Sequence, residues 1–129
     1  MKYAALSDTG KVRTQNEDAW NIIQDKHARP VGFVVADGMG GHEAGEVASR
    51  IAVEVLSETV LSCADLRMNL DDAELSLRDG LDEANRRIIL YSRETLKGVS
   101  SGTTLTAAWL DGPMMLLIHI GDSRAYLFR

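Results

Sequence analysis

Apolar residues near both ends of the chain gather in short runs bounded by glycine and polar residues. Runs of this kind predict β-strands. The predicted strands are Lys2–Leu6, Ala19–Ile23, Val31–Ala36, Thr103–Leu110, Met114–Ile120 and Arg124–Phe128. The run Val31–Ala36 is apolar at nearly every position, which is typical of a strand that is covered on both faces.

The middle of the chain has a helical period instead. Apolar residues recur every three or four positions over residues 43–61 and again over residues 71–96, with charged residues between them. Gly80 lies inside the second of these predicted helices and indicates a close packing contact there. The order of strands, two helices and further strands predicts an α+β fold, with helices packed on a largely antiparallel sheet.

Composition narrows the class of protein. The chain has 129 residues, enough for a single domain over residues 1–129. Its formal net charge of -5 disfavours non-specific binding of nucleic acid, which needs a basic surface. Cys63 is the single cysteine and cannot form an internal disulfide, and the sequence shows neither a signal peptide nor a membrane-length apolar run. We therefore expect a cytoplasmic protein with no membrane partner.

The strand run 33–36 leads directly into Asp37-Gly38-Met39-Gly40-Gly41. This order places a carboxylate at the tip of a strand, and the glycines allow a sharp turn that exposes main-chain carbonyl groups. A carboxylate beside an exposed carbonyl suits a hard divalent cation such as Mg²⁺ or Mn²⁺. Asp37 would repel a bare phosphate, whereas a phosphate bridged by a metal ion could bind there.

Further carboxylates lie beside other predicted strands. Glu17 and Asp18 directly precede one strand, and Asp122 follows another in Gly121-Asp122-Ser123-Arg124. If these strands are neighbours in the sheet, the side chains can converge in one cleft with Asp37. Each could instead be a solvated turn residue or a helix cap, so the pattern alone leaves both readings open.

Other glycine-based and histidine-based sites fit poorly. In a dinucleotide fingerprint that starts at Gly38, the final glycine position is occupied by Glu43, and Gly45 is followed by Glu46 rather than by the lysine of a phosphate-binding loop. The three histidines are far apart and have no paired cysteines, which argues against a zinc site.

Four ordered motifs resemble the bacterial branch of the metal-dependent protein phosphatases of type 2C, the PPM family. The resemblance covers essentially the whole chain. The motifs are Arg13-Thr14-Gln15-Asn16-Glu17-Asp18, Asp37-Gly38-Met39-Gly40-Gly41-His42, Ser101-Gly102-Thr103-Thr104 and Gly121-Asp122-Ser123-Arg124-Ala125-Tyr126. The resemblance implies an antiparallel β-sandwich flanked by helices, with two and in some members three Mn²⁺ or Mg²⁺ ions at one end.

The same resemblance implies a role for each site residue. Asp37 would bridge both metals, the Gly38 carbonyl would ligate one of them, and Glu17 and Asp18 would hold metals directly or through water. Asp122 resembles the ligand of a third, weaker metal. The implied activity is hydrolysis of phosphoserine and phosphothreonine in a phosphoprotein substrate by a metal-activated water.

The resemblance also implies that Arg13 binds the substrate phosphate. A planar guanidinium suits bidentate contact with phosphate oxygens. Asp37 and Arg13 are thus the candidates for direct roles in catalysis. Eukaryotic relatives often have a histidine where this chain has Met39. His42, three residues further on, is a candidate proton donor or a local hydrogen-bonding residue.

Family catalytic domains are longer than this chain, so the resemblance identifies it as the N-terminal portion, with a sandwich that is incomplete at the C-terminus. The alternative is a non-catalytic phosphatase-like module that binds or regulates without hydrolysis. The resemblance also implies an opposing Ser/Thr kinase, and the predicted final strand 124–128 would offer an edge for self-association.

Overall fold

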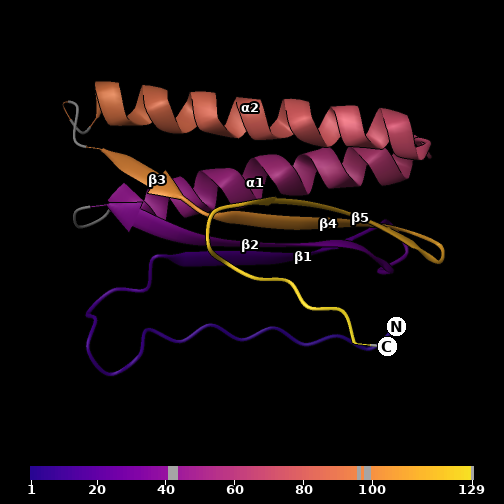
Figure 1. Ribbon diagram of the computed structural model, residues 1–129, viewed down its shortest axis with the longest axis horizontal. Coiled ribbons are helices and arrows are strands. Elements are labelled where there is room, and N and C mark those ends of the chain that lie inside the picture. The colour runs from indigo at the N-terminus through magenta and orange to yellow at the C-terminus, as the bar shows by residue number, and fades with distance from the viewer. Residues whose placement is uncertain (41–43, 96, 98–99, 129) are drawn as a thin grey trace.

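The computed structural model describes residues 1–40, 44–95, 97 and 100–128. Two helices are stacked on one face of an antiparallel sheet, while the two ends of the chain run along the other face (Figure 1). In chain order the elements are β1 (Asp18–Gln24), β2 (Pro30–Gly40), α1 (Ala44–Asp65), α2 (Leu70–Glu94), β3 (Ser101–Thr103), β4 (Leu105–Asp111) and β5 (Met114–Ile120). The α+β fold class is confirmed.

The sheet has the strand order β1-β2-β4-β5, and β3 pairs with the far end of β2. All of these pairings are antiparallel. The two central strands β2 and β4 therefore lie between β1 and β5, whose outer edges are open in the described part of the chain. This part contains one sheet of the expected sandwich.

Helix α1 packs directly on the sheet through a mostly small apolar face. Leu56 and Val60 are fully buried between this helix and the strands, and Val34 and Ala36 are buried on the facing side of β2. Helix α2 lies over α1, where Gly80 sits so close to Thr59 that a Cβ on the glycine would come within 2.6 Å of the threonine hydroxyl oxygen. The predicted close contact at Gly80 is confirmed.

The other face of the sheet is only partly covered. Val34 and Ala36 are buried, but Val35 between them is half exposed, and so is Trp20, its partner on β1. Tyr3 of the N-terminal segment touches this face, edge-on to Phe33 with ring centroids 6.2 Å apart. The expectation that the apolar run of β2 is covered on both faces is wrong for this chain, because the helices cover one face alone.

Two predicted strands, Lys2–Leu6 and Arg124–Phe128, are absent as strands. Both segments run below the sheet in Figure 1, and their ends lie near each other. A strand is stabilised by hydrogen bonds to a neighbouring strand, and no described strand pairs with either segment. The strand edge that was expected at residues 124–128 therefore does not form, and the open edge on that side belongs to β5.

The predicted helix boundaries are nearly right. Helix α1 continues four residues beyond the predicted end, to Asp65, and α2 ends at Glu94 rather than at residue 96. The predicted first residue of α1, Glu43, and the predicted last residue of α2, Leu96, lie outside the described residues. Neither described helix combines the length and the apolar character that a membrane crossing requires.

Candidate functional site

Asp18 and Asp37 face each other directly across the β1–β2 ladder. Opposed residues of an antiparallel pair share a face, with Cβ atoms about 5 Å apart. This is the face turned away from the helices, because Ala36 beside Asp37 is buried under them. Burial, and after it the neighbouring Asp37 carboxylate, raises the pKa of the Asp18 carboxyl, while Arg13 opposes the shift. The structure thus brings two like charges together.

Glu17 is held by its main chain at the start of β1. Its carbonyl oxygen accepts hydrogen bonds from the Gly38 N–H, at 3.1 Å, and from the Ser49 hydroxyl, at 2.6 Å. Its carboxylate lies against Gly45 in the first turn of α1, where a Cβ on the glycine would overlap Glu17 Oε2. The positive end of the helix dipole stabilises a carboxylate in this position.

The glycines after Asp37 have a different role from the one expected. Strand β2 does not turn at Asp37 but continues to Gly40, where it pairs with β3. Gly38 has no positive φ. A Cβ on Gly38 would overlap the Gly45 carbonyl oxygen, so the glycine is required for the strand to pass close to the start of α1. The prediction of a sharp turn is wrong for Gly38 and Gly40, because the strand continues through both of them and pairs with β3. Gly41, the third glycine of the run, lies outside the described residues.

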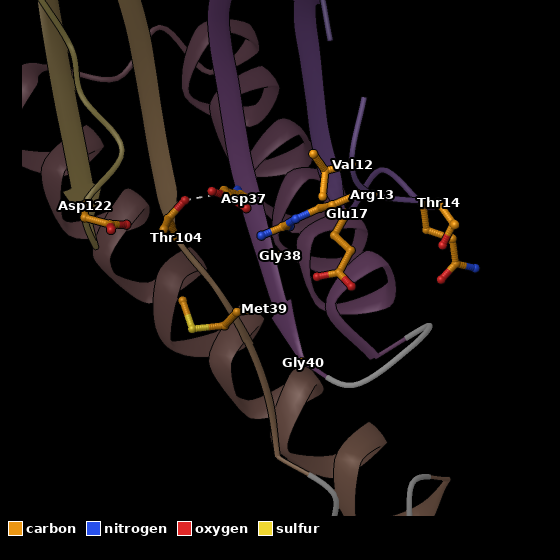
Figure 2. Close-up of a pocket in the computed structure, with 11 residues that line it drawn as sticks. Val12, Arg13, Thr14, Glu17, Asp37, Gly38, Met39, Gly40, Thr104 and Asp122 are labelled. Carbon is orange, nitrogen blue, oxygen red and sulfur yellow. Dashed lines mark hydrogen bonds between the residues drawn. The ribbon is translucent and has the colours of Figure 1, made fainter. Parts of the chain in front are cut away.

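Asp122 lies near the opposite edge of the sheet from Asp18. It follows β5, and two strand spacings separate β5 from β2, a distance of about 10 Å. Figure 2 shows Asp122 on the far side of Thr104 from Glu17, with Asp37 between them. The four acidic residues therefore share one end of the sheet, but Asp122 is not a direct neighbour of the Asp18–Asp37 pair.

A cavity of about 660 Å³ is lined by three of these acidic residues, Glu17, Asp37 and Asp122, whereas Asp18 is not part of its lining. Arg13 reaches it from the loop before β1, and its guanidinium is drawn beside Gly38 in Figure 2. The cavity is lined by Val12, Arg13, Thr14, Gln15, Glu17, Asp37, Gly38, Met39, Gly40, Thr104 and Asp122. It is polar, and it joins a cationic side chain to carboxylates, which suits an anionic group carried by a metal ion.

The oxygen ligands present meet part of the coordination that a divalent cation requires. Within the described ranges, no three Asp, Glu, His or Cys side chains converge closely enough to enclose one ion. The Asp18–Asp37 pair supplies two carboxylates. Mg²⁺ commonly binds through one or two carboxylates and fills its other positions with water and phosphate oxygens. The residues present therefore fit an open, water-rich metal site rather than a closed one.

The histidines divide between the described and undescribed parts. His42, the candidate proton donor, lies outside the described residues. His119 bonds through Nδ1 to the Thr106 hydroxyl, at 2.9 Å, and through Nε2 to the Gly121 carbonyl, at 3.1 Å. Since a carbonyl only accepts, Nε2 donates to Gly121, and in the neutral imidazole Nδ1 accepts from Thr106. His119 is a structural residue of the β4–β5 end of the sheet.

Three residues of the site were not singled out by the sequence reasoning. Ser49 and Thr104 are the two buried polar side chains in the described part of the chain, and both bond to the main chain of an acidic residue. Gly45 makes room for Glu17. Thr104 was visible as part of the Ser101-Gly102-Thr103-Thr104 motif, whereas nothing in local spacing marks Gly45 or Ser49.

The fold and the site together define an α+β protein in which acidic residues and an arginine meet at one end of a helix-covered antiparallel sheet. A family model described as protein phosphatase 2C matches residues 10–129. The chain belongs to the protein phosphatase 2C family.

Curated relatives are bacterial serine/threonine phosphatases. The chain is 37% identical over 123 residues to serine/threonine phosphatase stp of Listeria welshimeri, covering 95% of this chain and 48% of that protein. It is 39% identical over 137 residues to serine/threonine protein phosphatase PstP of Mycobacterium tuberculosis, covering 100% of this chain and 23% of that protein. The chain thus spans about half, or less, of these relatives.

Solved structures agree with this assignment. The catalytic domain of serine threonine protein phosphatase PstP in complex with two manganese ions matches with a TM-score of 0.77 and 36% identity, over 95% of this chain and 49% of that one. Serine/threonine phosphatase Stp1 from Staphylococcus aureus matches with a TM-score of 0.82 and 33% identity, over 96% of this chain and 48% of that one. The shared fold extends over nearly all of this chain.

Proposed function

We propose that this chain provides part of the active site of a metal-dependent serine/threonine protein phosphatase that acts on phosphoserine and phosphothreonine. The observation that carries the proposal is the Asp18–Asp37 pair, two carboxylates opposed across β1 and β2 beside an arginine-lined cavity. Like charges directly opposed in a sheet are unfavourable, and a bound cation removes this repulsion. The manganese ions of the related PstP domain support the same interpretation.

The residues that would hold Mn²⁺ or Mg²⁺ are Asp37 and Asp18, with Glu17 and the Gly38 carbonyl beside them. Asp122 would contribute to a further ion about two strand spacings away. Bound divalent ions supply Lewis acidity and lower the pKa of water, so that it can attack phosphorus near neutral pH.

The chain's own part in the reaction is to bind and orient the phosphate. Arg13 is exposed at the cavity and presents a fixed fork of N–H donors to phosphate oxygens. The transition state of phosphoryl transfer carries negative charge spread over these oxygens, so a positioned guanidinium stabilises it. The carboxylates opposite Arg13 keep a free phosphate from binding tightly without a metal ion.

The test is Mn²⁺ binding by the purified chain, followed by electron paramagnetic resonance, together with hydrolysis of a phosphothreonine peptide. Asp37→Asn should abolish Mn²⁺ binding and metal-dependent hydrolysis of the peptide. Asp111→Asn, at the end of β4 that is far from the site, should change neither. Equal Mn²⁺ binding by the wild type and by Asp37→Asn would contradict the proposal. Metal binding without hydrolysis would mean that the catalytic centre of this chain alone is incomplete, as in the N-terminal portion of a longer domain or in the alternative, a non-catalytic binding or regulatory module.

Further proposals follow from the sequence and the family. A single domain over residues 1–129, the N-terminal portion of a longer catalytic domain, is supported by the half-length coverage of the relatives. A cytoplasmic location is supported by the single, buried Cys63.

An opposing Ser/Thr kinase is supported by the family alone. Self-association would now involve the open edge of β5, and sedimentation at increasing concentration tests it.

A further inference from the structure

Thr104 lies opposite Asp37 in the sheet and connects two parts of the site. The Asp37 N–H donates a hydrogen bond to the Thr104 hydroxyl, at 3.0 Å, and the same hydroxyl is 2.7 Å from the hydroxyl of Ser123. Thr104 is 2% exposed. One buried side chain therefore touches both the main chain of Asp37 and the loop that carries Asp122.

The hydroxyl takes the place of a main-chain acceptor. Val35 pairs with Thr106 and Gly38 pairs with Thr103, so the unbroken register places Thr104 opposite Asp37. The Thr104 N–H donates to the Asp37 carbonyl at 2.9 Å in the ordinary way, but the Asp37 N–H goes to the side chain of Thr104. The conformation of Asp37 therefore depends on the side chain at position 104 and not only on the backbone.

A second contact holds the Asp122 loop on the same threonine. Gly121 has a φ of +101°, and a Cβ on it would come within 2.7 Å of the Thr104 methyl group. Its carbonyl also accepts the hydrogen bond from His119. The residues on both sides of Asp122 thus touch Thr104, one through packing and the other through a hydrogen bond.

We propose that Thr104 is a positioning residue that fixes Asp37 and Asp122 relative to each other, an inference that rests on the proposed function of these two carboxylates. Threonine supplies three things at once: an acceptor for the Asp37 N–H, a hydroxyl partner for Ser123, and a methyl group under Gly121. Serine keeps the first two, and valine keeps the shape but neither hydrogen bond.

The experiment compares Thr104→Val, Thr104→Ser and Ser123→Ala in the purified chain. Thr59→Val is the matched control, because its hydroxyl bonds within α1, to the Val55 carbonyl, away from the site. Amide hydrogen exchange without metal reads the Asp37 N–H directly. Mn²⁺ affinity is measured for each variant alone and in combination with Asp122→Asn. It shows whether the placement of Asp122 relative to Asp37 depends on Thr104.

We expect the Asp37 amide to exchange on the order of tenfold faster in Thr104→Val, because its hydrogen bond is lost, and to stay protected in Thr104→Ser. Mn²⁺ binding should be weaker in Thr104→Val than in the wild type and close to the wild type in Thr104→Ser. Asp122→Asn should weaken Mn²⁺ binding less in the Thr104→Val protein than in the wild type. Ser123→Ala should reduce the effect of Asp122→Asn on Mn²⁺ affinity, because the contact between this loop and Thr104 is lost, while leaving the Asp37 amide protected.

Two results would overturn the inference. One is an Asp37 amide that exchanges in Thr104→Val as slowly as it does in Thr59→Val. The other is a double variant whose loss of Mn²⁺ binding free energy equals the sum of the losses in Thr104→Val and Asp122→Asn, since the effects of independent sites are additive.

If the wild type binds no Mn²⁺ at all, the proposed function fails, and amide exchange alone then decides the role of Thr104. If Thr104→Val does not fold, Ser123→Ala and Thr104→Ser decide it by the same readouts.

Discussion

Gly45, in the first turn of α1, lies directly under the carboxylate of Glu17, so that a side chain on the glycine would occupy the position of Glu17 Oε2. The same hypothetical Cβ would come within 3.0 Å of the Gly38 carbonyl carbon. One missing side chain thus lets the helix start, strand β2 and an acidic residue of the site meet in one place.

Replacing Gly45 with alanine should therefore damage the site and not only the packing. Alanine is favoured over glycine inside a helix by up to about 1 kcal/mol, but overpacking costs about 1–3 kcal/mol. The steric cost should exceed the gain in helix propensity, because main-chain atoms of Gly38 cannot move away easily. We expect a net loss of about 1 kcal/mol in unfolding free energy, measured by urea denaturation, together with weaker Mn²⁺ binding.

Gly80→Ala is the matched control for this change. It also creates a close contact inside a helix, with Thr59, but far from the acidic residues. It should lower stability while leaving Mn²⁺ affinity unchanged. Equal loss of metal binding in both alanine variants would show that Gly45 acts through stability alone.

Ser49→Ala should cost about 1 kcal/mol of unfolding free energy, because a buried hydroxyl that bonds to the Glu17 carbonyl is lost. The loss is limited because the Gly38 N–H still donates to the same carbonyl. Ser57→Ala, on the same helix, removes only a solvent-exposed hydrogen bond from the Asn21 side chain and should change stability by less than about 0.5 kcal/mol. Indistinguishable denaturation midpoints for the two variants would contradict this assignment.

Leu56 should be a strong determinant of stability, because it is 0% exposed between α1 and the sheet. Truncating a buried leucine to alanine costs about 2–5 kcal/mol through lost burial and the cavity left behind. Leu66, just after α1, is 68% exposed, and its truncation should cost less than about 0.5 kcal/mol. Thermal unfolding of both variants tests the pair, and comparable losses would disprove the packing assigned to α1.

Stability at acid pH should depend on Asp25. The Arg29 side chain, and next the Arg29 and His27 backbone N–H groups, hold the pKa of Asp25 at about 2 instead of the usual 3.8. Since the folded-state pKa is lowered, this stabilisation is present above pH 3.8 and is lost as the pH falls towards 2. Arg29→Ala should raise the pKa of Asp25 towards 3.8, as measured by carbon NMR titration of the carboxyl.

Glu83 is the internal control for that titration. Its pKa is also held at about 2, by Arg86 and Arg87 on α2. It should stay there in Arg29→Ala, because the ion pairs of Glu83 share no residue with the Asp25–Arg29 pair. An Asp25 pKa that does not move on removal of Arg29 would refute the stated cause.

The amino-acid sequence determined the two helices and four of the five strands, β1, β2, β4 and β5, because a helical period of about 3.6 and short apolar runs are local properties. It also singled out the acidic residues and Arg13 as candidates for the site, since their motifs are read without knowledge of contacts. Tertiary structure decided the rest. Lys2–Leu6 and Arg124–Phe128 have strand-like patterns but form no strand, because strand formation depends on a neighbour that local sequence does not specify.

The geometry of the site shows the same division. The sequence placed Asp18, Asp37 and Asp122 near predicted strand ends, but strand order alone decided that Asp18 opposes Asp37 while Asp122 lies two strands away. Gly45, Ser49 and Thr104 contact the acidic residues Glu17 and Asp37, which are 28 to 67 positions distant in the chain. Such contacts exist only after the helices and strands have packed, because they depend on interatomic distances across elements and not on spacing along the chain.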